Sequence, residues 1–243
     1  MGKLDGKVVI ITGAGRGIGQ GIALGFAQEG AQIVCAARTQ SQIDATVTQI
    51  HELGASAIAL QTDVTSAESV SAMYEKTLAS YGKVDIVIAN AGGTISHDPV
   101  ETDVIEDFVG TIQLNLIGAY YTAKFAIPYL KEKGGQIIMM GSGLGHRAGG
   151  KGYAAYSTAK AGLWMFTRAL AAELREYPIC VNELIPGLVQ VVEDDTPPSA
   201  DSPLSLEWYK KPADVVPLAL FLATQPFTGP SGQSFSLMRR DSQ

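Results

Sequence analysis

The sequence predicts an α/β fold in which a parallel β-sheet is covered by helices on both faces. Short β-branched segments alternate with longer helical segments along all 243 residues, and such alternation produces right-handed βαβ crossovers. The first of these segments runs directly into a glycine-rich turn. No linker-like change of composition divides the chain, so we expect one domain over residues 1–243.

The predicted strands are short and rich in apolar, β-branched residues, as in a sheet buried on both faces. They cover residues 7–11, 32–37, 56–61, 84–89, 136–140, 179–185 and 234–238. The predicted helices carry apolar residues at helical spacing and stop at glycine or proline. They cover residues 17–28, 42–53, 66–80, 103–133, 155–175 and 213–224, with Ser66 as an N-cap and 103–133 as one continuous helix.

Composition excludes several classes of protein. Hydrophobic residues make up 46% of the chain, which excludes disorder and suffices for a large core. Cys35 and Cys180 show no paired spacing, so both are expected to be buried apolar residues. A net charge of −6 argues against binding to nucleic acid. His97 and His146 lack partners at metal-ligand spacing, so no metal is expected.

Targeting and membrane segments are not evident in the sequence. No apolar run approaches the roughly 18 residues of a membrane-spanning helix. The segment Met1–Asp5 lacks the small-residue cleavage site of a signal peptide. We therefore expect a cytoplasmic protein that does not contact a membrane.

Glycine is unusually common, at 27 of 243 residues, which is about 11% against a usual ~7%. Between the first strand and the first helix, Gly13, Gly17 and Gly19 form the pattern T-G-x-x-x-G-x-G. Glycines at such a turn let the backbone approach a pyrophosphate, whose charge meets the amides and positive end of the helix. The alternative is a glycine-rich turn without a ligand. The turn predicts a dinucleotide site with these cofactor-binding residues: Gly13, Gly15, Arg16, Gly17, Ile18 and Gly19.

The end of the second strand distinguishes NADP from NAD. An acidic residue there holds the ribose 2′-hydroxyl of NAD, whereas arginine accommodates the 2′-phosphate of NADP. Here Ala37 stands at the acidic position, Arg38 follows it, and Arg16 lies in the glycine turn. This favours NADP (as NADPH), with NAD as the alternative if Arg38 is only a solvated strand end. Asp63 is expected either to accept from the adenine amino group or to cap a turn before Thr65.

The pattern Tyr-x-x-x-Lys occurs three times, where chance gives about 0.4 copies for this composition. The copy Tyr156/Lys160 opens a helix shortly after Ser142, which ends the fifth strand. Ligands of such sheets bind at the carboxyl ends of the strands, so these three side chains can meet in one site. The other two copies lie on the long helix before that strand, where packing and solvation account for them: Tyr120/Lys124 and Tyr129/Lys133.

The chemistry of carbonyl reduction fits this trio. A proton donor is needed at the oxygen while hydride arrives at the carbon. A phenol is a poor acid–base at neutral pH unless a nearby cation lowers its pKa. Lys160 supplies that cation to Tyr156 and can hold the nicotinamide ribose, and Ser142 can donate to the substrate oxygen.

The chain contains a set of motifs in a fixed order: Thr12–Gly19, Asn90-Ala91-Gly92, Asn115, Ser142, Tyr156-x-x-x-Lys160 and Pro186-Gly187. In this order and spacing, over essentially the whole chain, it resembles the classical short-chain dehydrogenase/reductase family. The resemblance implies Tyr156 as the acid–base, Lys160 as its activator, and Ser142 as the ligand of the carbonyl oxygen. Asn115 would order a water in the proton relay.

The resemblance also implies further site residues, a fold and an assembly. Additional cofactor-binding residues would be Val64, Asn90, Ala91, Gly92, Pro186, Gly187 and Val189. Substrate-binding residues beside Ser142 and Tyr156 would be Leu144, His146 and Tyr153. The implied fold is a Rossmann-type doubly wound parallel sheet of about seven strands, commonly in a homo-oligomer (tetramer or dimer) built partly on the long helices.

Two departures from the family pattern stand out. Val191 occupies a position where the family commonly has threonine beside the nicotinamide, with Gln190 as a possible substitute. Relatives often end in a valine-aspartate-glycine-glycine stretch, whereas this chain has Arg239 and Arg240 near its end. Three roles are open for these arginines: contact with a neighbouring subunit, contact with an acidic substrate, or a place in a solvated tail.

The leading hypothesis is an NADPH-preferring carbonyl reductase or alcohol dehydrogenase. A substrate loop is expected at about 188–211. Its acidic run Glu193–Asp195 either disfavours anionic substrates or simply faces solvent. The candidate substrates are a 3-oxoacyl thioester or a small neutral ketone, with a sugar, polyol or steroid-type alcohol as the alternative. A catalytically silent dinucleotide-binding regulator would be expected to lack Ser142, Tyr156 or Lys160, and all three are present.

Overall fold

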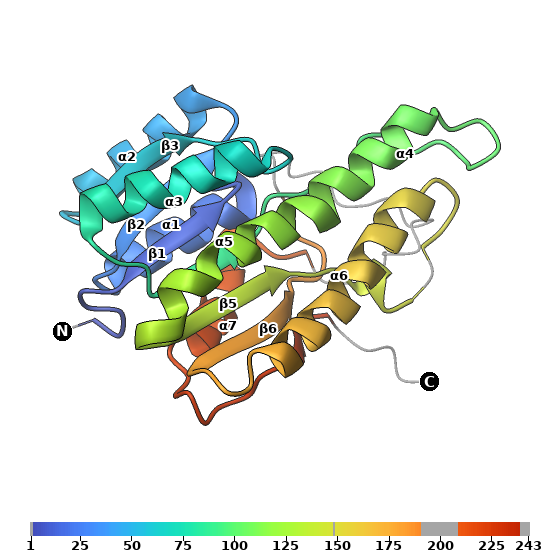
Figure 1. Ribbon diagram of the computed structural model, residues 1–243. Helices are drawn as coiled ribbons and strands as arrows, with labels where there is room; N and C mark the ends of the chain where they lie inside the picture. Colours follow the sequence, from blue (N-terminus) through green and yellow to red (C-terminus); the bar gives the residue numbers. More distant parts are fainter. Residues whose placement is uncertain (1, 148, 191–208, 239–243) are drawn as a thin grey trace.

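The computed structural model describes residues 2–147, 149–190 and 209–238. Its centre is a seven-stranded sheet in the order β3-β2-β1-β4-β5-β6-β7, and each neighbouring pair runs parallel (Figure 1). The predicted doubly wound α/β architecture is therefore confirmed. The strands are β1 (Val8–Thr12), β2 (Gln32–Ala37), β3 (Ala57–Gln61), β4 (Ile86–Ala89), β5 (Gly135–Met140), β6 (Ile179–Ile185) and β7 (Ser234–Ser236).

Helices cover both faces of the sheet, and α4 projects from the body of the molecule (Figure 1). One face carries α1, α2 and α7, and the other carries α3, α5 and α6. The α-helices are α1 (Gly17–Gln28), α2 (Gln40–Glu52), α3 (Ala67–Tyr81), α4 (Ile105–Ile112), α5 (Gly118–Lys133), α6 (Ala154–Glu173) and α7 (Val216–Ala223). The shorter elements are the π-helical η1 (Gln113–Ile117) and the 3₁₀ turns η2 (Gly143–Gly145) and η3 (Pro212–Val215).

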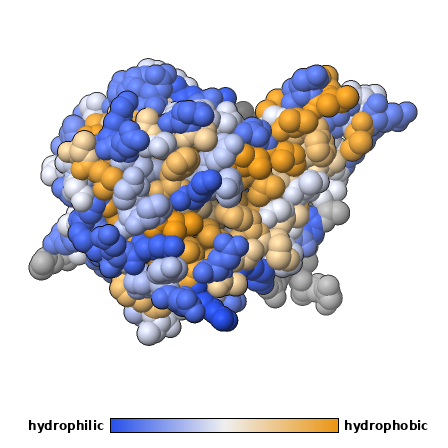
Figure 2. Space-filling model, in the orientation of Figure 1, coloured by the Kyte–Doolittle hydropathy of each residue, from blue (hydrophilic) through white to orange (hydrophobic). Residues whose placement is uncertain are grey.

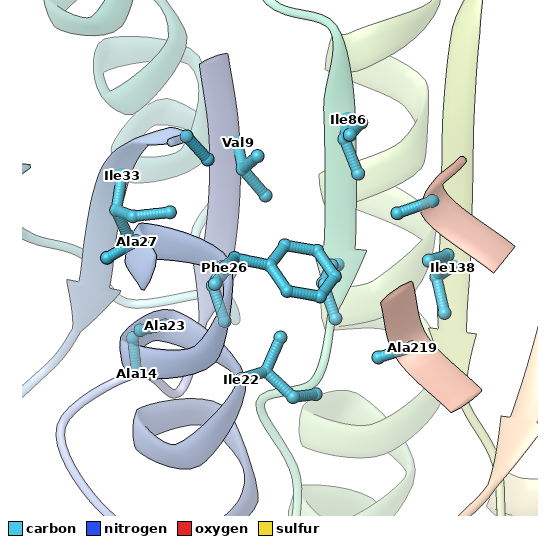
Figure 3. Packing of buried hydrophobic residues seen from close by; sticks show 14 of the residues in the cluster. Val9, Ala14, Ile22, Ala23, Phe26, Ala27, Ile33, Ile86, Ile138 and Ala219 are labelled. Atoms are coloured by element: carbon cyan, nitrogen blue, oxygen red, sulfur yellow. The ribbon is translucent and has the colours of Figure 1, made fainter. Parts of the chain in front are cut away.

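The alternation of side chains along each strand separates two hydrophobic cores. In β1, Val9 and Ile11 belong to the core under α1 and α7, while Val8 and Ile10 belong to the core under α3, α5 and α6. Figure 3 shows Phe26 of α1 lying over the strands of the first core. Both faces of β1 are thus buried, which explains its continuous β-branched sequence.

The interval 103–133 differs from its prediction as one continuous α-helix. It consists of α4, a π-helical turn and α5, and Asn115 lies in the π-helical turn. The Asn115 amide nitrogen donates to the Thr111 carbonyl (2.9 Å) and, outside the helix, to the Gly93 carbonyl (2.7 Å). A π-turn inserts one extra residue per turn and so re-aims the following side chains.

Other local predictions are confirmed. The Ser66 hydroxyl caps α3 by accepting from the Ser69 amide at 3.1 Å. Cys35 and Cys180 are both buried, and burial raises the pKa of the Cys35 thiol to about 12. Within residues 2–147, 149–190 and 209–238, no helix is long and apolar enough to cross a bilayer.

The order of the strands locates the binding edge. From β1 the chain proceeds outward to β2 and β3, and then returns to β4 on the other side of β1. In doubly wound sheets the ligand binds beyond the carboxyl ends of the strands where this reversal occurs. In this chain that point lies between Thr12, at the end of β1, and Ala89, at the end of β4.

Candidate active site

A cleft of about 590 Å³ opens at this edge of the sheet. Its lining comes from segments that follow β1, β2, β3, β4, β5 and β6, and from α6. The predicted residues that line it are Gly13, Gly15, Arg16, Gly17, Ile18, Arg38, Val64, Asn90, Ala91, Gly92, Ser142, Tyr156, Lys160, Pro186, Gly187 and Val189. The fold therefore brings the predicted cofactor and catalytic motifs into one cavity.

The glycine turn is shaped for close approach of a ligand. Gly13 has a φ of +67°, a conformation that other residues rarely adopt, and a Cβ there would stand 2.9 Å from the Asn90 amide nitrogen. The first residues of α1 follow directly, and Arg16, its N-cap, makes no side-chain capping bond. The amides of this helix end are therefore available to an anionic ligand.

Asn90 and Thr12 hold the glycine turn against the end of β4. The Asn90 side-chain nitrogen donates to the Thr12 carbonyl at 2.9 Å and to the Gly13 carbonyl at 3.3 Å. In return the Thr12 hydroxyl accepts from the backbone amides of Asn90 (3.0 Å) and Ala91 (3.1 Å). These four hydrogen bonds cross between the two halves of the sheet, so the turn and the catalytic half keep a fixed geometry.

At the far end of the cleft, the second strand ends without an acidic side chain. Ala37 and Arg38 line the cleft there together with Arg16. Neither guanidinium has an ion pair with any described residue. Thr39 and Gln42, on the approach to and first turn of α2, also line this end. Sequence reasoning missed both, because no local pattern shows that α2 begins over the cleft.

The predicted catalytic trio lies at the other end of the cleft. Ser142 follows β5, and Tyr156 and Lys160 lie one turn apart on α6. The Lys160 ammonium stands 5.5 Å from the centre of the Tyr156 ring and donates to the Met140 carbonyl at 2.8 Å. The Ser142 hydroxyl accepts from the Leu144 amide at 3.2 Å.

Burial shifts the pKa values of two members of this trio, Tyr156 and Lys160. Desolvation lowers the pKa of Lys160 to about 8, and the negative charge of Glu183 opposes that fall. Desolvation raises the pKa of Tyr156, and a hydrogen bond with Ser142 opposes that rise. The Lys160 ammonium and the Tyr156 phenol thus lie next to each other with pKa values that burial shifts in opposite directions.

Asn115 does not line the cleft, and it is 1% exposed. Its amide oxygen accepts from the Gly93 amide at 3.0 Å, and its nitrogen donates back to the Gly93 carbonyl. A Cβ on Gly92 would stand 2.6 Å from the Asn115 oxygen and 3.4 Å from the Lys160 nitrogen. The Asn115 side chain therefore fixes the Gly92–Gly93 segment beside Lys160.

Two residues expected to bind the cofactor lie off the cleft. Gly19 packs beneath the turn, where a Cβ would collide with the Gly13 carbonyl. Asp63 is absent from the lining, and its carboxylate accepts from the Thr65 amide (2.9 Å) and hydroxyl (2.8 Å). Of the two roles open for Asp63, the structure shows the turn cap.

Three residues expected to bind substrate also do not line the cleft: Leu144, His146 and Tyr153. His146 is directed to Glu183, with its Nε2 2.9 Å from the carboxylate. Tyr153 packs edge-on against His97, with ring centres 5.1 Å apart. These tertiary contacts decide the direction of the side chains, and a local sequence pattern does not show them.

The predicted substrate loop is described only at its two ends. Val189 forms a parallel bridge with Lys210, and the Gln190 amide donates to the Lys210 carbonyl at 2.9 Å. The two described ends of the loop therefore lie side by side. The predictions for Val191, for the acidic run 193–195 and for Arg239 and Arg240 lie outside the described residues.

Comparisons with known proteins agree with this arrangement. The short chain dehydrogenase family model matches residues 7–197. A 3-oxoacyl-[acyl-carrier-protein] reductase of Synechocystis is 34% identical over 98% of this chain and 97% of its own length. An uncharacterized oxidoreductase of Mycobacterium tuberculosis is 34% identical over 92% of this chain and 88% of its own.

Comparison with solved structures points to the same family. A short chain dehydrogenase from Burkholderia cenocepacia in complex with NADP superposes with a TM-score of 0.86 at 28% identity, covering 96% of this chain and 97% of that one. A Serratia marcescens short-chain dehydrogenase/reductase mutant superposes with a TM-score of 0.90 at 26% identity, covering 97% of each chain. With its Rossmann-type sheet and its family match over most of its length, the chain belongs to the short-chain dehydrogenase/reductase family, whose oxidoreductases bind a nicotinamide dinucleotide.

Proposed function

We propose that this protein is an NADPH-preferring carbonyl reductase or alcohol dehydrogenase that interconverts a ketone and a secondary alcohol. The observation that carries the proposal is the meeting of Ser142, Tyr156 and Lys160 in the same cleft as the glycine turn. The cleft fits a dinucleotide, because Gly13, Gly15 and Gly17 of its turn line it without side chains and its helix end offers free amides.

The chain's own residues account for proton transfer at the substrate oxygen. NADPH, when bound, supplies the hydride. Tyr156 holds the proton that the carbonyl oxygen receives, and Ser142 donates a hydrogen bond to the same oxygen. Lys160 favours the phenolate that remains, because its ammonium lies over the Tyr156 ring. Asn115 holds the Gly92–Gly93 segment beside Lys160.

The cofactor preference rests on Arg16 and Arg38. Both guanidinium groups line the end of the cleft where the second strand stops, and neither has an ion pair among the described residues. A 2′-phosphate would supply the missing negative charge, whereas a 2′-hydroxyl would leave both cations without a partner. The complex of the Burkholderia relative with NADP supports the same preference.

For the substrate, we propose a 3-oxoacyl thioester or a small neutral ketone. Relatives in Synechocystis and Thermotoga maritima carry the name 3-oxoacyl-[acyl-carrier-protein] reductase. Leu114 and Leu188 give the cleft an apolar wall near the catalytic residues. A sugar, polyol or steroid-type alcohol is the alternative within the same family.

The test is a panel of ketones, 3-oxo esters and polyols incubated with NADPH or NADH, with the loss or gain of nicotinamide absorbance as the readout. We expect turnover of at least one ketone with NADPH, and slower turnover with NADH. NADPH binding without turnover of any compound in the panel would instead support the silent regulator.

We also propose that the protein forms a homo-oligomer whose interface contains α4 and the adjoining part of α5. Figure 2 shows hydrophobic side chains gathered along the projecting α4 and the adjoining part of α5. Val104, Ile105 and Val109 are 52%, 76% and 57% exposed there, which is costly for a helix that remains in water. Sedimentation of the purified protein would test the proposal, and a monomer at micromolar concentration would contradict it.

A further inference from the structure

Lys160 and Glu183 are the only charged side chains that are buried within the described part of the chain, at 3% and 0% exposed. Lys160 belongs to the proposed catalytic trio. Glu183 lies in β6, and no step of the proposed reaction uses it. Because an unpaired charge is very costly to bury, the position of Glu183 requires a physical explanation.

The carboxylate of Glu183 is held from one side only. Its Oε2 accepts from the Ser234 hydroxyl of β7 at 2.5 Å and lies 2.9 Å from Nε2 of His146. Its Oε1 is buried and has no hydrogen-bond partner. The network fixes the orientation of the carboxylate but leaves one oxygen uncompensated.

The Oε1 atom, which has no hydrogen-bond partner, points at the segment Met140–Ser142. Oε1 packs on Gly141, where a Cβ would collide with it. The preceding residue, Met140, accepts the hydrogen bond of the Lys160 ammonium at 2.8 Å. The following residue is Ser142. Glu183 therefore contacts the backbone that joins two members of the trio.

Building on the proposed function, we propose that Glu183 is a positioning residue of the active site. Its carboxylate, held by His146 and Ser234, fixes the Met140–Ser142 backbone and keeps Lys160 in its charged form. The same negative charge favours the protonated phenol of Tyr156, which is the form that gives its proton to the carbonyl oxygen in the proposed reduction. The carboxylate thus acts on the reaction through the protonation of Lys160 and Tyr156 and does not itself touch the substrate.

The charged groups around this pair are few. Lys160 is faced by Tyr156 from its own helix and by Glu183 from β6, whereas β5 and η1 contribute uncharged groups. Glu183 is faced by His146 from the segment after β5 and by Lys160 from α6, and β7 contributes only the Ser234 hydroxyl. Burial lowers the pKa of Lys160 to about 8, and the charge of Glu183 acts against that fall.

Removing the negative charge of Glu183 should lower the pKa values of both Lys160 and Tyr156. Without it, Lys160 and Tyr156 both lose protons more readily, because each deprotonation then occurs in a more positive field. Since the two groups are coupled, the apparent pKa of the Tyr156 phenol reports on the pair. We expect Glu183→Gln to lower this pKa by about one pH unit.

The experiment measures tyrosinate absorbance in the cofactor-free protein. The titration of wild type minus Tyr156→Phe isolates the phenol, and the same subtraction in the Glu183→Gln background gives the shift. Glu173→Gln is the matched control, because it makes the same change of charge at an exposed site on α6 and should leave the pKa in place. Thermal unfolding checks that each variant folds.

Two further variants separate charge from shape. Glu183→Ala also removes the charge, relieves the contact with Gly141, and must lower the pKa in the same direction. It also serves if the glutamine variant does not fold. His146→Gln keeps the carboxylate and must not lower the pKa. An unchanged or raised pKa in both Glu183 variants, or an equal fall in His146→Gln, would overturn the proposal.

This readout is independent of turnover. If wild type reduces no ketone but the pKa falls in Glu183→Gln, the proposed function fails while the coupling of Glu183 to the pair stands. If turnover is normal and the pKa does not move, the proposed function stands and the role of Glu183 fails.

Discussion

Arg16 and Arg38, at the end of the cleft where β2 stops, make the proposed cofactor preference open to a quantitative test. The change is Arg38→Leu, which removes the guanidinium but keeps the aliphatic part of the side chain. Arg38 and Arg16 both line the cleft, are exposed, and lack ion pairs within the described residues. We expect NADPH to bind more weakly to the variant and NADH to bind as before.

The magnitude follows from the exposure of the side chains. A hydrogen bond to a charged group contributes about 1.5–3 kcal/mol, and solvent screening at an exposed site reduces this to about 1–1.5 kcal/mol. Arg38→Leu should therefore weaken NADPH binding about 5- to 13-fold. Because both groups would contact one phosphate, the Arg16/Arg38 double variant should show a non-additive loss.

The assay is the dissociation constant of NADPH and of NADH, measured by fluorescence titration without substrate. Arg175→Leu serves as the control, because Arg175 is exposed beyond the end of α6 and does not line the cleft. Ala37→Asp should act in the opposite sense and favour NADH, since it places a carboxylate at the acidic position. An equal loss of NADPH and NADH affinity in Arg38→Leu would refute the reasoning, because the guanidinium would then contact a part shared by both cofactors.

Three further outcomes are expected. Tyr156→Phe should lower turnover at least ~100-fold with NADPH affinity retained, as measured by steady-state rates and fluorescence titration. Lys160→Met should be inactive yet unfold at a higher temperature than wild type. The difference in unfolding temperature should shrink between about pH 8 and pH 10.5. In that range the folded wild type has lost the Lys160 proton, whereas the unfolded chain still binds it, so the wild type gains stability as the pH rises. Thermal unfolding of both proteins as a function of pH measures this difference. Phe26→Ala empties a fully buried position and should cost about 3–5 kcal/mol in urea unfolding.

Most of the fold was predictable because its signals are local. The helix at 17–28 and the strands at 32–37 and 179–185 have the predicted bounds, since apolar periodicity and flanking Gly or Pro mark their ends. The break in 103–133 was not predictable in this way. A π-turn changes the hydrogen-bond register without changing the composition, and the bond from Asn115 that accompanies it reaches Gly93, 22 residues away.

The candidate site, like the fold, has parts that local sequence signals predict and parts that they do not. The glycine turn and the Tyr156/Lys160 pair were predictable, because the required spacing lies within one turn or one helix. The environment of Glu183 was not, because His146 and Ser234 come from sites 37 and 51 residues away in sequence. His146, predicted as a substrate-binding residue, has its Nε2 2.9 Å from this carboxylate, a contact that no local pattern shows.

Two asparagines connect the binding and catalytic halves of the cleft. Asn90 joins the glycine turn to the end of β4 through the carbonyls of Thr12 and Gly13. The segment that follows is fixed in turn by Asn115 at Gly93, next to Lys160. Each link is a hydrogen bond between buried or half-buried groups, so the contacts that lead from the glycine turn to the segment beside Lys160 have a defined geometry. Under the proposed function, the position of the dinucleotide relative to Tyr156 and Lys160 would therefore depend on Asn90, which lines the cleft, and on Asn115, which does not.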